Sequence, residues 1–119
     1  LLPLIENGVL IQSNYGSIIG QYKKETQITV KKMLEHKMVH LLGSDVHRPQ
    51  AIYPKIGECI QEIERIVGND YTDFITTMNP QKIINGEEIS INLLTNKMMK
   101  EICFFIEDKP NNKDMYNIL

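Results

Sequence analysis

Two short apolar runs along the chain each end in small and polar residues. Residues 9–11 are Val-Leu-Ile and lead into Gln12, while residues 38–42 lead into Gly43 and Ser44. A parallel strand covered on both faces has this continuous apolar character, and functional loops follow the carboxyl ends of such strands. We therefore predict two similar parallel strands, at residues 9–11 and 38–42.

The segment between the two predicted strands has the spacing of a helix. Within residues 20–37, Val30, Met33 and Leu34 recur at helical intervals, and lysines and glutamates occupy other positions. Two parallel strands need a crossover of about a dozen residues, most often a helix with a right-handed connection. The three elements together predict a βαβ unit, and the fold class is α/β.

A second amphipathic helix is predicted after the second strand. From Ile52 to Val67, apolar residues recur at i, i+4, i+7 and i+8, and charged residues lie largely opposite them. Gly68 follows this stripe and is predicted to end the helix.

Helix punctuation recurs at several other places. Residues 71–78 predict a short helix, and the Asn-Pro pair at residues 79–80 has the pattern of an N-cap followed by proline at the first helical position. Asn-Gly pairs at residues 7–8 and 85–86 are predicted to close the helices that precede them. Residues 90–119 are expected to hold one helix and a loose end, to which we assign no function.

The composition fits one domain of ordinary globular character. Among 119 residues, 13 are basic and 15 acidic, giving a net charge of −2, and this balance argues against a nucleic-acid partner. No run of about 18 apolar residues and no basic leader occur, so we expect a cytoplasmic protein without a membrane span. Cys59 and Cys103 lack CxxC spacing, and both are expected to be buried thiols.

A carboxylate and an imidazole follow the second predicted strand two residues apart. Asp45 and His47 lie where functional groups gather in parallel α/β folds. Both side chains are good ligands for Mn, Fe or Zn, although a metal site needs further ligands from elsewhere. The alternative is that Asp45 only forms a turn or caps a helix and that His47 is simply exposed.

Residues 12–20 form the second candidate segment, because they are rich in amide, hydroxyl and glycine groups. Gln12, Asn14 and Ser17 belong to it, and Ser17 is the best single donor for an anionic ligand. The alternative is a turn in which Asn14 or Ser17 caps the crossover helix. His40, inside an apolar run, is predicted to be a core or edge residue rather than a ligand.

Three stretches of the chain form a recognisable pattern: residues 8–12 (GVLIQ), 16–20 (GSIIG) and 38–47 (MVHLLGSDVH). Together they resemble the final third of bacterial PHP-type (polymerase and histidinol phosphatase) protein tyrosine phosphatases of capsular and exopolysaccharide clusters. The most specific element is the strand that ends in Ser-Asp-x-His, preceded by the Gln-containing strand and the Gly-Ser loop. The resemblance covers residues 1–88 and includes residues 79–86 (NPQKIING), which are similar to the family's last helix.

This resemblance implies the carboxyl-terminal portion of a distorted, TIM-like (β/α)7 PHP barrel with Mn-type divalent ions at its mouth. Asp45 and His47 fall on the family's last two metal ligands, while Gln12, Asn14 and Ser17 would lie near the substrate. The implied reaction is hydrolysis of phosphotyrosine on a partner capsule tyrosine kinase. Divalent ions there activate water and neutralise phosphate oxygens, so no cysteine nucleophile is needed.

The chain also departs from the family pattern. The family's opening His-x-His motif, bridging glutamate and intermediate histidines have no counterpart here, so only two ligands are represented. We therefore expect residues 1–89 to be the carboxyl-terminal part of the barrel and residues 90–119 to be an extension. On its own, the 119-residue chain is expected to lack phosphatase activity.

Two other functions stay open at this point. The same scaffold serves other phosphate esters, such as histidinol phosphate, because a fold does not fix the substrate. The chain could instead be a non-catalytic packing module that forms homo-oligomers, because a partial barrel exposes strand edges and apolar helix faces.

Overall fold

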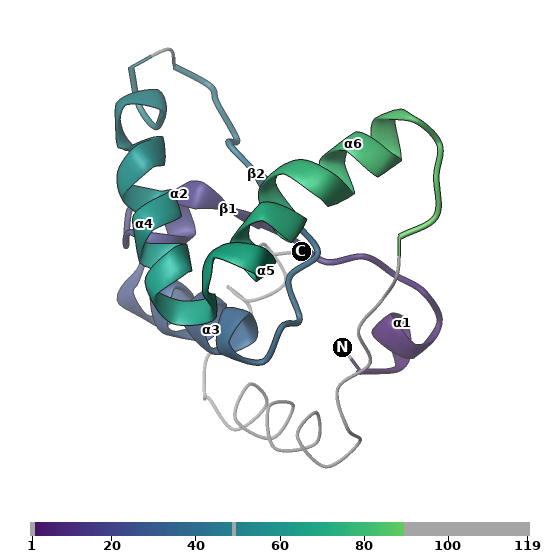
Figure 1. Ribbon diagram of the computed structural model, residues 1–119. Coiled ribbons are helices and arrows are strands. Elements are labelled where there is room, and N and C mark those ends of the chain that lie inside the picture. Colours follow the sequence, from purple (N-terminus) through teal and green to yellow (C-terminus); the bar gives the residue numbers. More distant parts are fainter. Residues whose placement is uncertain (1, 49, 90–119) are drawn as a thin grey trace.

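Two parallel strands and the helices around them make up the fold, shown as a computed structural model in Figure 1, which describes residues 2–48 and 50–89. Strand β1 (Gln12–Asn14) pairs with strand β2 (Leu41–Gly43), so that the first residues of the two strands face each other. The parallel pairing and the α/β class that the sequence predicts are confirmed.

Both strands lie further along the chain than the apolar runs predict. The predicted strand at residues 9–11 is wrong, because β1 begins only at Gln12. The carbonyl of Ile11 accepts hydrogen bonds from the N–H groups of His40, at 2.8 Å, and Leu41, at 3.2 Å. In β1 the ladder therefore forms where the polar residues begin, whereas β2 consists of the last two apolar residues of its run and Gly43.

Helices and helical turns account for most of the remaining described chain. They are α1 (Leu2–Glu6), α2 (Tyr15–Ile18), α3 (Lys24–Glu35), η1 (Tyr53–Lys55), α4 (Ile56–Val67), α5 (Asn69–Asp73), η2 (Phe74–Met78) and α6 (Asn79–Ile84). As predicted, α1 ends at an Asn-Gly pair, where Gly8 has a φ of 85° and its N–H donates to the Ile5 carbonyl at 2.9 Å. Gly86, with a φ of 70°, closes α6 in a similar way.

The predicted crossover helix is α3, and an extra helical turn precedes it. Residues 12–20 are expected to be a loop from the sequence, but they contain β1 and the four-residue α2. Along α3, the predicted apolar face is confirmed, because Val30, Met33 and Leu34 are each at most 3% exposed.

The apolar stripe after β2 becomes η1 followed by α4, which begins at Ile56 rather than Ile52. Cys59 and Ile63 are fully buried on α4, which packs against α2 and α3. The expectation of a buried thiol is therefore confirmed for Cys59, while Cys103 and the helix expected near it lie outside the described residues.

The predicted helix from Asn79 to Ile84 is confirmed as α6, but the predicted capping role of Asn79 is wrong, because the chain is already helical through α5 and η2 and the N-cap of α6 is Met78. The N–H of Asn79 donates to the carbonyl of Phe74, five residues earlier, so this segment is π-helical. A proline ring clashes with the carbonyl four residues before it in an α-helix, and a π-bulge gives Pro80 room. The Asn79 side chain is fully buried and donates to the His40 carbonyl at 2.9 Å.

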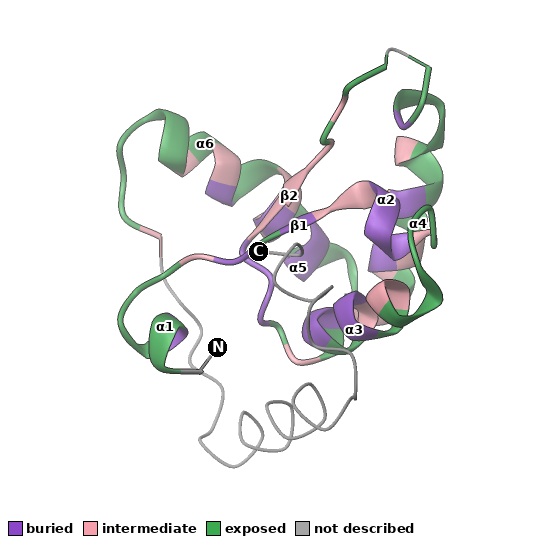
Figure 2. Cartoon of the chain, turned by 180° about the vertical axis from the view of Figure 1, so that it is seen from behind, coloured by how far each residue is buried: buried purple, intermediate pink, exposed green. Residues whose placement is uncertain are grey.

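The buried core lies between the sheet, α3, α4 and the α5–η2 segment. Figure 2 shows buried positions gathered on α2, α3 and the chain around the strands, whereas most of α1 and α6 is exposed. The core cluster consists of Ile5, Ile11, Ile18, Val30, Met33, Leu34, Met38, Val39, Ile63, Tyr71 and Ile75. These contacts fix the sheet on its helical layer and thereby set the position of the loop after β2.

Candidate functional site

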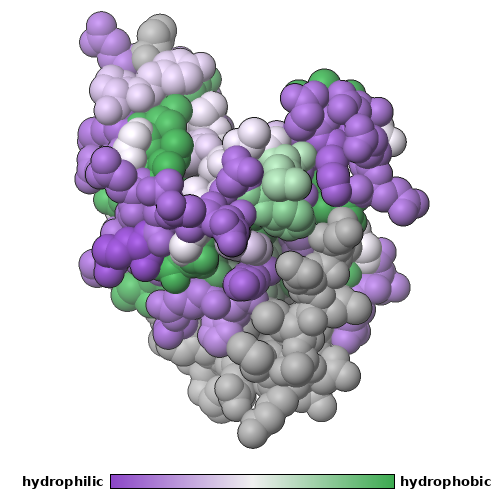
Figure 3. Space-filling view, in the orientation of Figure 1, coloured by the Kyte–Doolittle hydropathy of each residue, from purple (hydrophilic) through white to green (hydrophobic). Residues whose placement is uncertain are grey.

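The loop after β2 carries both predicted metal ligands. It rises from the sheet between α4 and α6 (Figure 1), and the surface is hollowed between the sides that carry these two helices (Figure 3). Asp45 has a φ of 49°, in the left-handed region that aspartate tolerates better than most residues. Its side chain is 44% exposed and that of His47 is 79% exposed, so both are accessible.

The Asp45 carboxylate is held by two side chains from earlier in the chain. Asn14, at the end of β1, donates from Nδ2 to Asp45 Oδ2 at 3.3 Å. The Tyr22 hydroxyl donates to the same oxygen at 3.4 Å. Asn14 pairs with Gly43 in the sheet, which brings its amide within reach of the loop that follows. Strand pairing therefore joins the two candidate segments that the sequence predicts.

Gly43 leaves room for the amide side chains of β1. A Cβ at Gly43 would lie 2.5 Å from Gln12 Nε2 and 3.4 Å from Asn14 Oδ1. Residues two apart on a strand share one face, so Gln12 and Asn14 both lie over the end of β2. Both amides are therefore placed at the edge where Asp45 leaves the sheet.

The His47 ring is oriented by the backbone of the same loop. Its Nδ1 lies 2.7 Å from the carbonyl oxygen of Asp45. Because a carbonyl can only accept, Nδ1 carries the proton, and the lone pair of the neutral ring is on Nε2. This arrangement is typical of metal-binding histidines, whose second nitrogen donates to a carbonyl or carboxylate.

The two side chains after β2 could supply part of the ligand set of a divalent metal site. Asp45 offers a carboxylate oxygen and His47 a neutral imidazole nitrogen, with His47 Nδ1 3.6 Å from Asp45 Oδ1. Within residues 2–48 and 50–89, no group of three or more His, Cys, Asp or Glu side chains is arranged to hold a metal ion. Two donors of this kind act only as part of a larger ligand set.

Ser17 lies in α2 and is buried, with 5% of its surface exposed. No hydrogen bond among the described residues joins it to Asp45 or His47, so its role at the site stays a prediction. The alternative that Asn14 or Ser17 caps the crossover helix is wrong, because the N-cap of α3 is Lys23. Asn14 precedes α2, but its side chain makes no capping bond and reaches Asp45 instead.

Tyr22 and Gly43 take part in this arrangement, although the sequence pattern does not point to them. A signal for Gly43 is its place two residues before a candidate ligand and opposite an amide-bearing strand. A signal for Tyr22 is a phenol in the turn that joins the second candidate segment to α3. Their roles depend on strand register, which short apolar runs do not specify.

His40 is a core residue, as the sequence predicts, and lies apart from this loop. It is 3% exposed, and its Nδ1 accepts the N–H of Ile11 at 3.0 Å. Burial lowers the pKa of the His40 imidazole below its ordinary value, so the neutral ring is favoured.

Comparisons with known proteins place this chain among sequences linked to capsule synthesis. A family model described as "Capsular polysaccharide synthesis, CpsB/CapC" matches residues 2–85, which include both strands and every residue named at the candidate site. No curated protein and no solved structure matches the chain. None of the helices in the described part of the chain is long and apolar enough to cross a bilayer.

Proposed function

This chain belongs to the CpsB/CapC capsular polysaccharide synthesis family, and we propose that it forms the carboxyl-terminal part of a metal-dependent protein tyrosine phosphatase. Residues 1–89 contribute the last portion of a PHP barrel, and residues 90–119 extend it. The substrate is phosphotyrosine on a cytoplasmic tyrosine kinase that regulates capsule or exopolysaccharide synthesis.

The observation that carries this proposal is the contact between the two strand ends. Asn14 holds the Asp45 carboxylate, and the Asp45 carbonyl fixes the tautomer of His47. These contacts leave the Nε2 lone pair of His47 available as a ligand in the loop that also carries the oriented Asp45 carboxylate. Such an arrangement at the carboxyl end of parallel strands supports metal binding better than it supports a simple turn.

Each named side chain has a distinct role in this proposal. Asp45 and His47 Nε2 hold a divalent cation, Mn or alternatively Fe or Zn, together with ligands from the rest of the barrel. When bound, such a cation polarises phosphoryl oxygens and lowers the pKa of water. Gln12, Asn14 and Ser17 line the substrate side, where amide and hydroxyl groups donate to phosphate oxygens.

Cys59 does not support a cysteine-dependent phosphatase mechanism. Its thiol is fully buried on α4 and lies 3.4 Å from the carbonyl of Tyr15. Burial, together with the charge of Glu58, raises the pKa of the Cys59 thiol. A protonated, inaccessible thiol is a poor nucleophile, so Cys59 serves packing.

The proposal predicts that the complete phosphatase loses activity when either ligand is replaced. With Mn²⁺ and a phosphotyrosine peptide, Asp45→Asn and His47→Ala should each lower kcat at least about 100-fold, because they remove a cation ligand. Asp73→Asn, an exposed carboxylate on α5, is the matched control and should keep wild-type turnover. Circular dichroism verifies that all variants keep their fold.

Two results would contradict this assignment. Normal turnover of Asp45→Asn or His47→Ala would exclude these residues as ligands. A strong preference of the wild-type enzyme for histidinol phosphate over the peptide would keep the scaffold and replace the substrate. The 119-residue chain alone should show no turnover, because the two ligands proposed within residues 2–48 are fewer than a metal site requires.

A further inference from the structure

We propose that Tyr22 is a positioning residue that orients the Asp45 carboxylate for a divalent cation. This inference rests on the proposed function, because it assumes that Asp45 is a metal ligand. Tyr22 does not contact the cation in this scheme; it acts through Asp45.

The ring of Tyr22 has a defined place beside the candidate site. A Cβ on Gly16 would lie 3.2 Å from Tyr22 Cε2, so the absence of a side chain at Gly16 leaves space for the ring. Tyr22 is 47% exposed, and its hydroxyl reaches across to Asp45 in the loop after β2. Tyr22 thus links the turn before α3 to the loop after β2.

Tyr22 and Asn14 donate to the same oxygen of the Asp45 carboxylate. Their distances to Oδ2 are 3.4 and 3.3 Å, at the long end for hydrogen bonds. Such contacts tighten in many sites when the ligand binds. With Oδ2 taken by two donors, Oδ1 is the oxygen directed to His47, whose Nδ1 lies 3.6 Å from it.

This division of the carboxylate explains why a hydroxyl is useful at position 22. Asp45 and His47 are exposed on a loop, so packing alone does not fix the rotamer of the carboxylate. Hydrogen bonds to a ligating carboxylate orient it. Replacing the residue that donates such a bond commonly weakens metal affinity roughly 10- to 100-fold. Phenylalanine would fill the same space beside Gly16 and lack the donor.

The test is the affinity of the complete phosphatase for Mn²⁺, measured from the electron paramagnetic resonance signal of the Mn²⁺ that stays free in solution. Tyr22→Phe should weaken the Mn²⁺ Kd about tenfold. Tyr53→Phe, which removes the hydroxyl of another exposed tyrosine in η1, should leave the Kd unchanged. The Tm of each metal-free protein separates a positioning role from a structural one, since Tyr22→Phe should not alter it.

The outcomes distinguish this inference from the function on which it rests. If Asp45→Asn abolishes Mn²⁺ binding while Tyr22→Phe binds like wild type, the positioning role of Tyr22 is wrong and the ligand assignment stands. If Asp45→Asn also binds like wild type, the proposed ligand is wrong and the inference falls with it. A Tm of metal-free Tyr22→Phe well below that of wild type would make Tyr22 a structural residue and overturn the inference.

Discussion

The His40 imidazole joins the ends of the two apolar runs by accepting the backbone N–H of Ile11. Acceptance requires Nδ1 to be unprotonated, and burial lowers the pKa of this ring below its ordinary value. The unfolded chain instead binds a proton at a pKa near about 6.5. Below that pH the unfolded state therefore binds more protons than the folded state, and folding becomes less favourable.

We expect the free energy of unfolding of the 119-residue chain to fall as the pH is lowered from about 7 to 5. His40→Leu should remove most of this pH dependence, because leucine does not titrate, although it also leaves the Ile11 N–H without an acceptor and lowers stability at pH 7. Urea unfolding at several pH values measures both effects. A wild-type slope in His40→Leu would contradict the role of His40.

At the scale of residues, the sequence identifies candidate chemical groups but not the residues that contact them. Asp45 and His47 stand out because a carboxylate and an imidazole follow an apolar run. The contacts of Asp45 with Asn14 and Tyr22 depend on strand register, which no local pattern encodes. Asn79 shows the opposite error, because a good capping pattern is overridden by a buried hydrogen bond to the His40 carbonyl.

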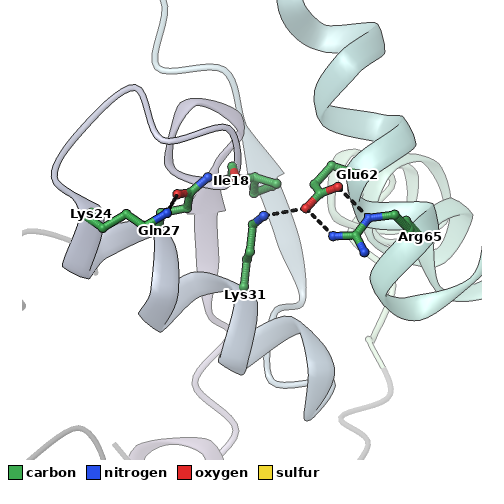
Figure 4. Close-up of polar contacts among 6 residues, drawn as sticks. All are labelled: Ile18, Lys24, Gln27, Lys31, Glu62 and Arg65. Carbon is green, nitrogen blue, oxygen red and sulfur yellow. Dashed lines mark hydrogen bonds and ion pairs between the residues drawn. The ribbon is translucent and has the colours of Figure 1, made fainter.

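At the scale of elements, one carboxylate connects the crossover helix to the helix after β2. Glu62 on α4 accepts hydrogen bonds from Lys31 on α3 and from Arg65 one turn further along α4, at 2.8 Å for each Arg65 contact (Figure 4). The Arg65 and Lys31 hydrogen bonds lower the pKa of Glu62 to about 2. The Glu62 and Lys31 side chains are 22% and 29% exposed, but that of Arg65 is 71% exposed, so solvent screens the Arg65 contacts more than the Lys31 contact.

Glu62→Gln should lower the free energy of unfolding at pH 7 by about 1 kcal/mol, because it removes the charge that two cations share. An unfolded glutamate titrates near about 4.3, so the stabilisation is complete above that pH and is lost as the pH falls towards 2. The gap between wild type and variant should therefore close over this range in urea unfolding. Glu58→Gln, at an exposed position of the same helix, is the control; a gap that stays constant with pH would refute the pKa argument.

The helices of this chain follow from periodicity more closely than its strands do. In both α3 and α4, apolar residues recur every three to four positions and form the buried face, so the spacing in the sequence predicts both helices. The apolar run at residues 9–11 marks neither a strand nor a fully buried segment, since the ladder starts at Gln12 and Val9 is 44% exposed. Strand limits depend on where two distant segments come close enough to bond, and this information is not local.

At the scale of the whole molecule, apolar surface remains uncovered beside a two-stranded sheet. Parallel sheets are normally covered on both faces and extended at both edges. Leu4 is 47% exposed on α1, and on α6 Ile83 is 44% and Ile84 is 79% exposed. Burying these exposed side chains would favour association of the 119-residue chain with a second copy of itself.

We expect the apparent mass of this chain in light scattering to rise with concentration. Ile84→Glu should reduce that rise and leave the Tm nearly unchanged, because the replaced side chain contributes little to the core. Gln81→Glu, an exposed position on the same helix, adds the same charge without removing apolar surface and is the control. A monomeric wild-type chain at high concentration, or equal effects of the two substitutions, would contradict this expectation.

The two hydrogen bonds to the Asp45 carboxylate also have a consequence for the order of folding. Its two donors, Tyr22 and Asn14, precede it by 23 and 31 residues, so no local fragment contains the arrangement. Helices such as α3 and α4 form from contacts between neighbouring residues. Bringing Asp45 to Asn14 or Tyr22 instead closes a loop of more than twenty residues, and the chain loses that entropy before the contacts form. We therefore expect the carboxylate to be oriented only after the strands meet, so that the cation-binding geometry proposed for this loop forms late in folding.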